Sequence, residues 1–368
     1  MKHQVAIVDA NAQHREAVAD ALLSFYTVHP YDSSVNAITG MLLSPPNLIL
    51  VGQRVGTSSG ATFIKELRRE RSLSALPFIF IIDNEDFRTV DLIRDLGITD
   101  YLVKPYHRSA LINAISKQLN GRIERSWQDL PASQRKALEG SLTAFNSVAD
   151  EIASGNPLPL RTITESCSAI VDVVNKEEFG FLFHKIKDHD NFTYVHSLRY
   201  STFISLFGKA IGLPKEQQVL IATGGMMHDI GKMTIPRALL NKEGRLTPSE
   251  TKLMHSHVTT SQKLLSTNES IPKGVATIVT HHHERLDGSG YPRGLRAPEL
   301  NQLARMAAII DVFCALTDRR PYKRALAAHV AFETMATEMQ CQLDQELLHR
   351  LKEILLDSAD TAGAPPPA

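Results

Sequence analysis

Short, uninterrupted apolar runs are the feature that most restricts how the first third of this chain can fold. Val5–Val8, Leu48–Val51 and Phe78–Ile82 contain no polar residue, and segments of helical character separate them. Strands that are apolar on both sides are buried on both faces, as in a parallel sheet covered by helices. We therefore predict a doubly wound α/β domain whose functional edge lies at the carboxyl ends of its strands.

The pattern changes after about residue 120, where amphipathic helices follow one another with almost no strand-like alternation. A chain of 368 residues is also too long for one ordinary core. We predict an α/β domain over 1–120, a helical linker over 121–159, an all-α domain over 160–355 and a disordered tail over 356–368. The linker helix predicted over 131–153 either forms a signalling or dimer contact or packs on its own domain.

The overall charge gives no reason to expect a nucleic-acid partner. Lys plus Arg and Asp plus Glu both number 40, so an anionic ligand must be met by a local group of charges. The three cysteines lie far apart and match neither a disulfide framework nor a CxxC metal site. No apolar run approaches the ~20 residues that span a bilayer, and the N-terminus lacks a signal-peptide segment. We expect a cytoplasmic protein without DNA binding or membrane insertion.

The first domain resembles a response-regulator receiver domain. Asp9 follows the first predicted strand and Lys104-Pro105 follows the last, as in that family. The position expected to accept phosphate is Gly52, the second acidic position is Ala10, and the expected switch hydroxyl is Ile82. Asp9 and Lys104 alone are equally explained by a structural salt bridge. The resemblance implies a degenerate receiver that is not phosphorylated and acts as a docking or dimerisation module.

Histidines are concentrated in the second domain, where nine of the 15 lie between residues 184 and 283. His228-Asp229 follows an apolar run, and a buried carboxylate is costly without a partner. Two cations would supply that partner, with Asp229 bridging them and Lys232 one turn on as a proton donor or phosphate contact. A solvated helix end would also explain the pair. His196 alone would more often be a hydrogen-bonded core histidine than a ligand.

Three further segments carry candidate ligands. His255 and His257 are two apart on one predicted helix and face different sides, so at most one is a ligand. Asp311 lies inside a strongly apolar helix and needs either a metal or a cationic partner. The run 281–292 joins three adjacent histidines to a glycine-rich, tyrosine-tipped loop, although three histidines can also cap a solvated helix end.

Together these segments resemble the HD-GYP family, metal-dependent phosphohydrolases of the HD superfamily that hydrolyse cyclic di-GMP. The resemblance covers about residues 190–325 and rests on three motifs in the family's order: HDIGK at 228–232, HHERLDGSGYP at 282–292 and RRPYKR at 319–324. It implies hydrolysis of a 3′–5′ phosphodiester to pGpG, GMP or both. It also implies an all-α fold and a regulatory role for the receiver-like domain.

The resemblance further implies a role for each matching residue. Asp229 would bridge two metals, and Lys232 would protonate the leaving group. Gly290, Tyr291, Arg320 and Lys323 would contact the substrate. The implied metal ligands are His196, His228, Asp229, His257, His282, His283 and Asp311, so that His255 and His281 are not ligands.

Two departures from the family bear on the metal centre. Members with a third metal carry a glutamate at the position of Phe192, so we expect two divalent ions. The family favours iron or manganese, and the ligand types also suit nickel, cobalt or zinc. The position often held by a second aspartate is Cys314, which we expect to tune activity rather than abolish it.

Partners follow from the same resemblance. Cyclic di-GMP is the expected ligand, with a homodimer through the receiver-like domain or the linker helix and a signalling protein as further candidates. A cyclic di-GMP-binding scaffold with little turnover is the alternative from another functional class, although such a protein needs neither the full ligand set nor Lys232. A mononucleotide phosphohydrolase is disfavoured by Tyr291, Arg320 and Lys323.

Overall fold

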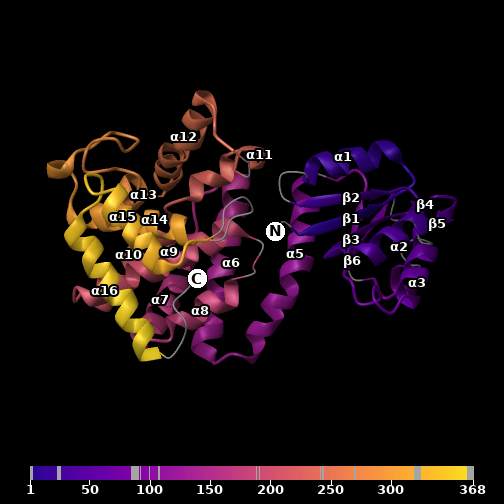
Figure 1. The fold of residues 1–368 in the computed structure, drawn as a ribbon, viewed down its shortest axis with the longest axis horizontal. Helices are drawn as coiled ribbons and strands as arrows, with labels where there is room; N and C mark the ends of the chain where they lie inside the picture. The colour runs from indigo at the N-terminus through magenta and orange to yellow at the C-terminus, as the bar shows by residue number, and fades with distance from the viewer. Residues whose placement is uncertain are drawn as a thin grey trace. The chain divides into compact units, whose positions relative to one another are not determined.

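The structure is a computed structural model in which the chain forms two compact units, residues 1–123 and 124–368. It describes residues 3–22, 26–83, 91, 93–98, 100–106, 108–187, 189, 191–240, 242, 244–268, 271–318 and 325–362. Figure 1 labels the elements of both units. Among these described residues no helix has the length and apolar character needed to cross a bilayer.

The first unit is built on a five-stranded parallel sheet in the order β2-β1-β3-β6-β7. Its strands are β1 (Gln4–Val8), β2 (Thr27–Tyr31), β3 (Leu48–Gly52), β6 (Phe78–Ile82) and β7 (Tyr101–Val103). A short hairpin of β4 (Arg54–Val55) and β5 (Ser58–Ser59) follows β3.

Helices bury both faces of this sheet, which confirms the predicted doubly wound fold. Alternate residues of β1, β3 and β6 pack against α2 (Ser34–Leu43) and α3 (Gly60–Arg69) on one face. The intervening residues pack against α1 (Ala12–Leu22) and α5 (Arg108–Arg125) on the other face. This two-sided burial is why the strands read as continuous apolar runs.

The carboxyl edge of the sheet holds a closed polar cluster around Asp9, which is 3% exposed. Its Oδ2 lies 2.7 Å from His14 Nδ1 and 3.5 Å from Lys104 Nζ, and its Oδ1 accepts from the Asn11 amide at 2.8 Å. Burial opposes ionisation of Asp9, but His14, Asn11 and Lys104 outweigh it and lower the pKa of the carboxyl group. Asp9 and Lys104 thus form an ion pair within a network that His14 extends to the Tyr106 hydroxyl at 2.6 Å.

Gly52 lies directly against this cluster at the end of β3. A Cβ atom added at Gly52 would overlap the carboxylate of Asp9, so a side chain fits there only if the Asp9 side chain moves. The position that the receiver resemblance assigns to the phosphate acceptor therefore has no nucleophile and is crowded by Asp9.

We predict that acetyl phosphate with Mg²⁺ leaves the first unit unmodified. Gly52 offers no nucleophile, and both oxygens of Asp9 already have partners in the protein. Intact-mass measurement followed by peptide mapping of residues 1–123 should show no added phosphoryl group. An aspartyl phosphate found anywhere in this segment would contradict the degenerate-receiver interpretation.

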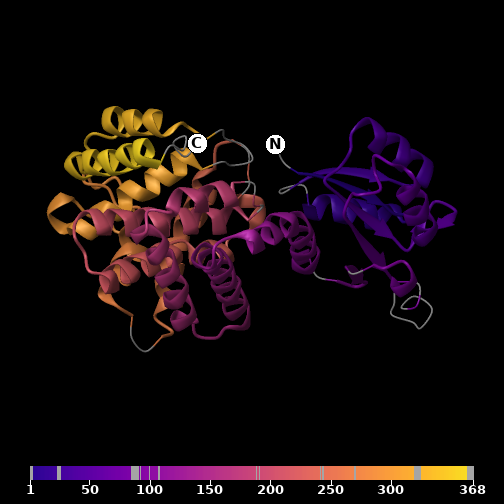
Figure 2. The ribbon, with the colours of Figure 1, turned by 90° about the horizontal axis from the view of Figure 1, so that it is seen from below.

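The second unit is helical, as predicted, and Figure 2 shows its helices from a second direction. Its first half comprises η1 (Ser126–Asp129), α6 (Ala132–Ser154), α7 (Leu160–Asn175), α8 (Phe179–Ile186), α9 (Phe192–Ala210) and α10 (Lys215–Met227). Its second half comprises η2 (Ile230–Thr234), α11 (Arg237–Leu240), α12 (Pro248–Leu265), α13 (Lys273–His281), η3 (Ala297–Glu299), α14 (Gln302–Thr317), α15 (Ala328–Glu338) and α16 (Gln345–Ala362).

The central element is α9, whose residues are buried on nearly every side. A helix that is buried all round lies in the core of its domain. Asn191 caps its start, because its side chain accepts from the Tyr194 amide. The Tyr194 hydroxyl donates to the Leu138 carbonyl at 3.2 Å and so ties α9 to α6. The helix α6 therefore packs within the second unit, and a dimer contact through it stays a prediction.

The start of α12 and the end of α16 are each well defined. A capping box begins α12, in which the side chains of Thr247 and Glu250 each accept from the other's backbone amide. The helix α16 extends to Ala362, past the boundary at residue 355 that the sequence predicted for this domain. Buried leucines hold the preceding turns of α16 in place, and no proline interrupts the sequence before Pro365.

Candidate metal centre

The seven predicted ligands come together inside the second unit although they are spread over more than a hundred residues. His196 lies on α9, His257 on α12 and Asp311 on α14, while the His228-Asp229 and His282-His283 pairs lie just after the ends of α10 and α13. Their ligand atoms form two groups, each within 4.8 Å. One group is Asp229, His257, His282 and His283, and the other is His196, His228 and Asp311.

Asp229 lies between the two groups with a side chain that is 1% exposed. Its Oδ1 is 3.1 Å from His257 Nε2 and 3.8 Å from His282 Nε2. Its Oδ2 is 3.3 Å from His228 Nε2 and 3.5 Å from His196 Nε2. Each oxygen thus faces a different group, which is the geometry of a bridging carboxylate.

Asp311 closes the arrangement from α14. Its Oδ2 lies 3.0 Å from His283 Nδ1, and its Oδ1 lies 3.7 Å from His196 Nε2. The sequence left open whether a metal or an arginine balances this carboxylate. Its close neighbours prove to be two of the candidate ligands.

Three of the imidazole rings are oriented by their own helices. In each, Nδ1 donates to the backbone carbonyl three residues earlier, which fixes the proton on Nδ1 and leaves Nε2 to face the cluster. The pairs are His228 with Gly225 at 2.7 Å, His257 with Met254 at 2.6 Å and His282 with Val279 at 3.1 Å.

Several of the atoms that face the cluster lack a hydrogen-bond partner. Among the described residues, Nε2 of His257, His282 and His283 and Oδ1 of Asp229 are buried without one. Buried polar atoms are almost always hydrogen-bonded, so such a convergence needs a cause. Metal–ligand bonds of about 2.0–2.2 Å place adjacent ligand atoms roughly 3 Å apart or slightly more. The spacing and chemistry of these atoms fit divalent cations.

Burial and neighbouring charges keep these side chains in the protonation states that bind a metal. Burial lowers the pKa of His283 to about 4 despite the opposing effect of Asp311. Burial and the neighbouring histidines His283 and His228 hold the pKa of His282 well below its usual value. Both rings are therefore neutral and keep the lone pair that binds a metal. Burial opposes ionisation of Asp229, but Lys232 and His228 outweigh it and hold its pKa far below normal.

His196 differs from these rings. Burial opposes its protonation, but contact with Asp311 and Asp318 raises its pKa to about 9. Its Nδ1 lies 2.6 Å from Asp318 Oδ2, and Arg199 Nε lies 2.9 Å from Asp318 Oδ1. The sequence predictions missed both of these residues. The three-residue spacing of His196 and Arg199 on an apolar helix was the available signal, whereas no local signal marks Asp318.

Lys232 lies on η2, one turn beyond Asp229, and its Nζ contacts Asp229 Oδ2. Its side chain is 17% exposed, so Lys232 is partly accessible to solvent. Gly231 beside it has no room for a Cβ, which would overlap the His257 carbonyl. The close approach of η2 to α12 thus places Lys232 beside the candidate bridging carboxylate.

The loop after His283 is held from beneath by Glu284, another residue that the sequence predictions missed. Its buried carboxylate accepts from the backbone amides of Arg293 at 2.8 Å and Leu295 at 2.9 Å. Gly290 packs so closely that a Cβ would overlap the backbone of residues 283–285. The result is a compact loop that carries Tyr291 at the edge of the metal cluster.

Tyr291 stacks on His255 with ring centroids 3.6 Å apart and an interplanar angle of 6°. It also lies 4.6 Å from the His283 ring, so it borders the cluster directly. Burial, with help from Asp311 and Asp229, raises the pKa of Tyr291, so its hydroxyl remains protonated. His255 thus stacks on Tyr291, a contact that the sequence did not predict.

The remaining predicted residues fall outside the two groups. His281 is half-buried and is not a member of either group. Phe192 opens α9 with 37% of its surface exposed, and Cys314 is fully buried with the pKa of its thiol raised well above normal by burial. Arg320 and Lys323 lie outside the described residues.

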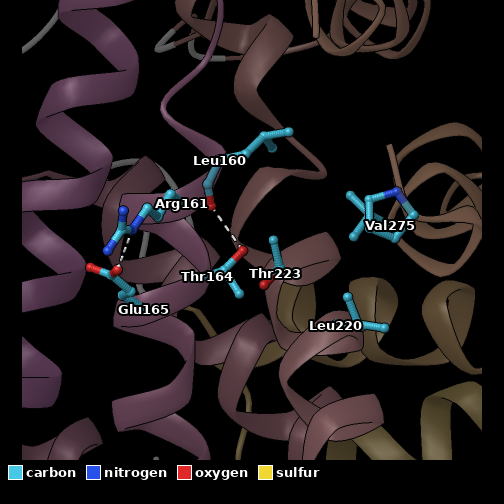
Figure 3. Close-up of a pocket in the computed structure, with 8 residues that line it drawn as sticks. Leu160, Arg161, Thr164, Glu165, Leu220, Thr223 and Val275 are labelled. Atoms are coloured by element: carbon cyan, nitrogen blue, oxygen red, sulfur yellow. Dashed lines mark hydrogen bonds and ion pairs between the residues drawn. The ribbon is translucent and has the colours of Figure 1, made fainter. Parts of the chain in front are cut away.

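A separate cavity of about 400 Å³ lies among α7, α10 and α13 (Figure 3). Aliphatic side chains dominate its lining, and an ion pair between Arg161 and Glu165 lies at its edge. None of the seven candidate ligands lines it. It is distinct from the metal cluster.

Comparison with known proteins defines the class to which this fold and cluster belong. A family model described as "HD domain" matches residues 182–347, and one described as "Response regulator receiver domain" matches residues 5–116. The first family implies a divalent-metal centre, which agrees with the His/Asp cluster. The protein is thus an HD-domain protein with an N-terminal receiver.

Individual relatives narrow this class. The "Cyclic di-GMP phosphodiesterase response regulator RpfG" of Xanthomonas campestris is 30% identical over 305 residues, which cover 81% of this chain and 72% of that protein. A "Cyclic di-GMP phosphodiesterase" of Thermotoga maritima is 28% identical over 89% of this chain and 84% of its own length. The chain belongs to the HD-GYP family of receiver-linked HD-domain proteins.

Other relatives match over a smaller part of their length. "Cyclic di-GMP phosphodiesterase PA4108" of Pseudomonas aeruginosa is 37% identical over 41% of this chain, and the match spans 37% of that protein. The "3'3'-cGAMP-specific phosphodiesterase 1" of Vibrio cholerae is 31% identical over 72% of this chain, and the match spans 63% of that protein.

We predict that Gly290→Ala destabilises the second unit by about 1–3 kcal/mol, the usual cost of forcing an extra methyl group into packed backbone. Gly180→Ala is the matched control, because nothing lies within 4 Å of a Cβ at that helical position. Urea unfolding followed by circular dichroism measures both changes. Equal stability of the two variants would show that the loop is not closely packed at Gly290.

Proposed function

We propose that this protein is a metal-dependent phosphodiesterase that hydrolyses cyclic di-GMP to pGpG, GMP or both. The observation that carries the proposal is the convergence of unpartnered imidazole nitrogens and a carboxylate oxygen on Asp229. A helical domain built around such a cluster suits phosphodiester hydrolysis by bound metals. Relatives such as RpfG and the Thermotoga maritima protein carry the name of this activity.

The proposed cofactor is a pair of divalent ions, with Asp229 as the bridging ligand. Nitrogen-rich sites with two carboxylates suit iron, manganese, cobalt, nickel or zinc better than magnesium or calcium, and we favour iron or manganese. The chemistry that such a pair supplies is activation of water and neutralisation of charge on phosphoryl oxygens. Phe192 offers no ligand atom where a third ion would need one, which supports two ions.

Lys232 is the proposed proton donor to the leaving alkoxide. Its ammonium group contacts the bridging carboxylate and still has access to solvent, so it stands beside the position proposed for the scissile bond. Donation from a positioned ammonium group prevents the build-up of negative charge on the departing oxygen. The ion pair with Asp229 holds the group in the direction of the cluster.

The loop that carries Gly290 and Tyr291 is the proposed substrate contact. The Tyr291 hydroxyl stays protonated and can donate to a phosphate or base oxygen, and the stacked Tyr291–His255 pair holds the ring in one orientation. Arg320 and Lys323 are proposed to hold the phosphates and the guanine face, on the strength of the family motif alone.

We propose the first unit as a regulatory or docking module that does not depend on phosphorylation. The closed cluster around Asp9 supports this role, because it leaves no acceptor for phosphate. A homodimer through the first unit or α6, and a signalling protein as partner, remain proposals. A cytoplasmic location follows from the proposed substrate, an intracellular second messenger.

Two competing functions are testable beside this one. A cyclic di-GMP-binding scaffold would bind the dinucleotide without hydrolysing it. A phosphodiesterase for 3′3′-cGAMP is suggested by the Vibrio cholerae relative. Turnover of each cyclic dinucleotide by the same metal-reconstituted protein separates the three functions.

We predict that the double variant His228→Ala, Asp229→Ala loses bound metal and cyclic di-GMP turnover together. Each group of ligands contains one of these two residues, so their removal leaves neither group intact. Metal content by mass spectrometry and product formation by chromatography measure the effect. His281→Ala, one residue from the cluster but outside both groups, should keep both properties. Equal turnover by the double variant and the wild type would refute the mechanism.

We also predict that Lys232→Met lowers kcat by about 10²–10⁴-fold, the usual contribution of a positioned proton donor. Bound metal should remain, because an ammonium group cannot be a ligand. Lys242→Met is the matched control, since Lys242 also pairs with a carboxylate, that of Glu250 at 2.7 Å. A wild-type kcat for Lys232→Met would exclude the proton-donor role.

A further inference from the structure

We propose that Asp318, held in place by Arg199, is the residue that positions His196 for metal binding. This inference rests on the proposed function in one respect, namely that His196 is a metal ligand. It concerns a carboxylate that no motif predicted and that does not face the metal positions itself.

The position of Asp318 is electrostatically unfavourable for a negative charge. It is the residue that ends α14, where the helix dipole disfavours a negative charge, and it is 5% exposed. A buried carboxylate is costly without partners. Its partners among the described residues include His196 Nδ1 at Oδ2 and Arg199 Nε at Oδ1, both from α9. The carboxylate therefore serves a contact with α9 rather than the stability of its own helix.

The contact with Asp318 determines which end of the His196 ring faces the cluster. A carboxylate only accepts, so the imidazole Nδ1 donates its proton and Nε2 becomes the ligand end. That atom lies 3.1 Å from His228 Nε2 and 3.5 Å from Asp229 Oδ2. Without the carboxylate the ring is free to carry its single proton on Nε2, where it would block a metal.

His196 depends on a distant side chain in a way that its neighbours do not. His228, His257 and His282 donate from Nδ1 to carbonyls of their own helices. His196 donates instead to a side chain 122 residues away, on another helix. A single side-chain substitution can therefore release His196, whereas the other three rings keep their backbone acceptors.

Arg199 holds the carboxylate of Asp318 from the opposite side. Its guanidinium lies over the rings of Phe183 at 5.4 Å and Phe203 at 5.5 Å, and Nη2 donates to Thr317 Oγ1 at 2.8 Å. These contacts immobilise a group that would otherwise have many rotamers. Arg199 thus presents a fixed positive charge to Asp318 Oδ1.

Cys314 is near Arg199 but does not balance its charge. It lies one turn before Asp318 on α14, close to Arg199, and burial keeps its thiol protonated. A neutral thiol cannot balance a buried guanidinium group. Asp318 supplies that negative charge, and the same carboxylate orients His196.

The test is Mn²⁺ binding to the metal-free, full-length chain, followed by the electron paramagnetic resonance signal of free Mn²⁺. We expect Asp318→Asn to weaken at least one binding step by about 10–100-fold, the usual effect of removing a partner that orients a ligand. Asp344→Asn is the matched control, because it removes a carboxylate paired with Arg305 at 3.0 Å in the same unit, away from the cluster. The control should bind Mn²⁺ as the wild type does.

A second measurement separates positioning from stability. In the Zn²⁺-loaded wild type, the Nδ1 proton of His196 should give a strongly hydrogen-bonded signal in an imidazole ¹⁵N–¹H spectrum. The signal should move or vanish in Asp318→Asn and persist in Asp344→Asn. If Asp318→Asn does not fold, Asp318→Glu, which keeps the charge but shifts the oxygens, should still move this signal and weaken Mn²⁺ binding.

Wild-type Mn²⁺ affinity at every step in a folded Asp318 variant would overturn the inference. A wild type that binds Mn²⁺ but hydrolyses no cyclic dinucleotide would contradict the proposed function alone, because the binding comparison would still decide the role of Asp318. A wild type that binds neither Mn²⁺ nor Zn²⁺ would contradict both.

Discussion

The buried carboxylate of Asp229 is the constraint around which the second unit is organised. Removing a charge from water is costly, and here only 1% of the side chain is exposed. Lys232 offsets part of that cost, and histidines from other helices face the rest of the carboxylate. The packing of α9, α10, α12, α13 and α14 is thus also the construction of a coordination site. Packing of a hydrophobic core alone does not orient several imidazole nitrogens toward one carboxylate.

The two buried carboxylates of Asp9 and Asp229 differ in how fully the surrounding protein satisfies them. In the first unit, Asp9 has protein partners for both oxygens, from His14, Asn11 and Lys104. In the second unit, Asp229 Oδ1 has no hydrogen-bond partner among the described residues, and neither do several nitrogens near it. The first arrangement is complete without a ligand, and the second is not. The cluster around Asp9, whose polar atoms have partners, is therefore structural, and the cluster around Asp229, with unpartnered atoms, is the candidate functional site.

Much of this could be predicted from the sequence because the signals are local. Apolar runs such as Phe78–Ile82 predict a buried parallel sheet, and the adjacent His228-Asp229 pair after an apolar helix indicates a metal site. The roles of Asp318 and Glu284 depend on partners that are distant or on backbone amides, so no spacing reveals them. Asp318 lies 122 residues from His196, and Glu284 binds the loop that follows it only because that loop turns back over its carboxylate.

The contact between Gly52 and Asp9 limits what a substitution at position 52 could restore in the first unit. A single Gly52→Asp substitution would not restore a phosphate acceptor, because the new side chain would collide with the Asp9 carboxylate before any chemistry was possible. The His14 and Lys104 contacts would have to loosen first, and that change alone confers no phosphorylation. A carboxylate at position 52 therefore needs the Asp9 side chain to leave its present orientation and its present partners. The packing of a neighbouring side chain thus adds to the missing nucleophile in separating this position from a phosphate acceptor.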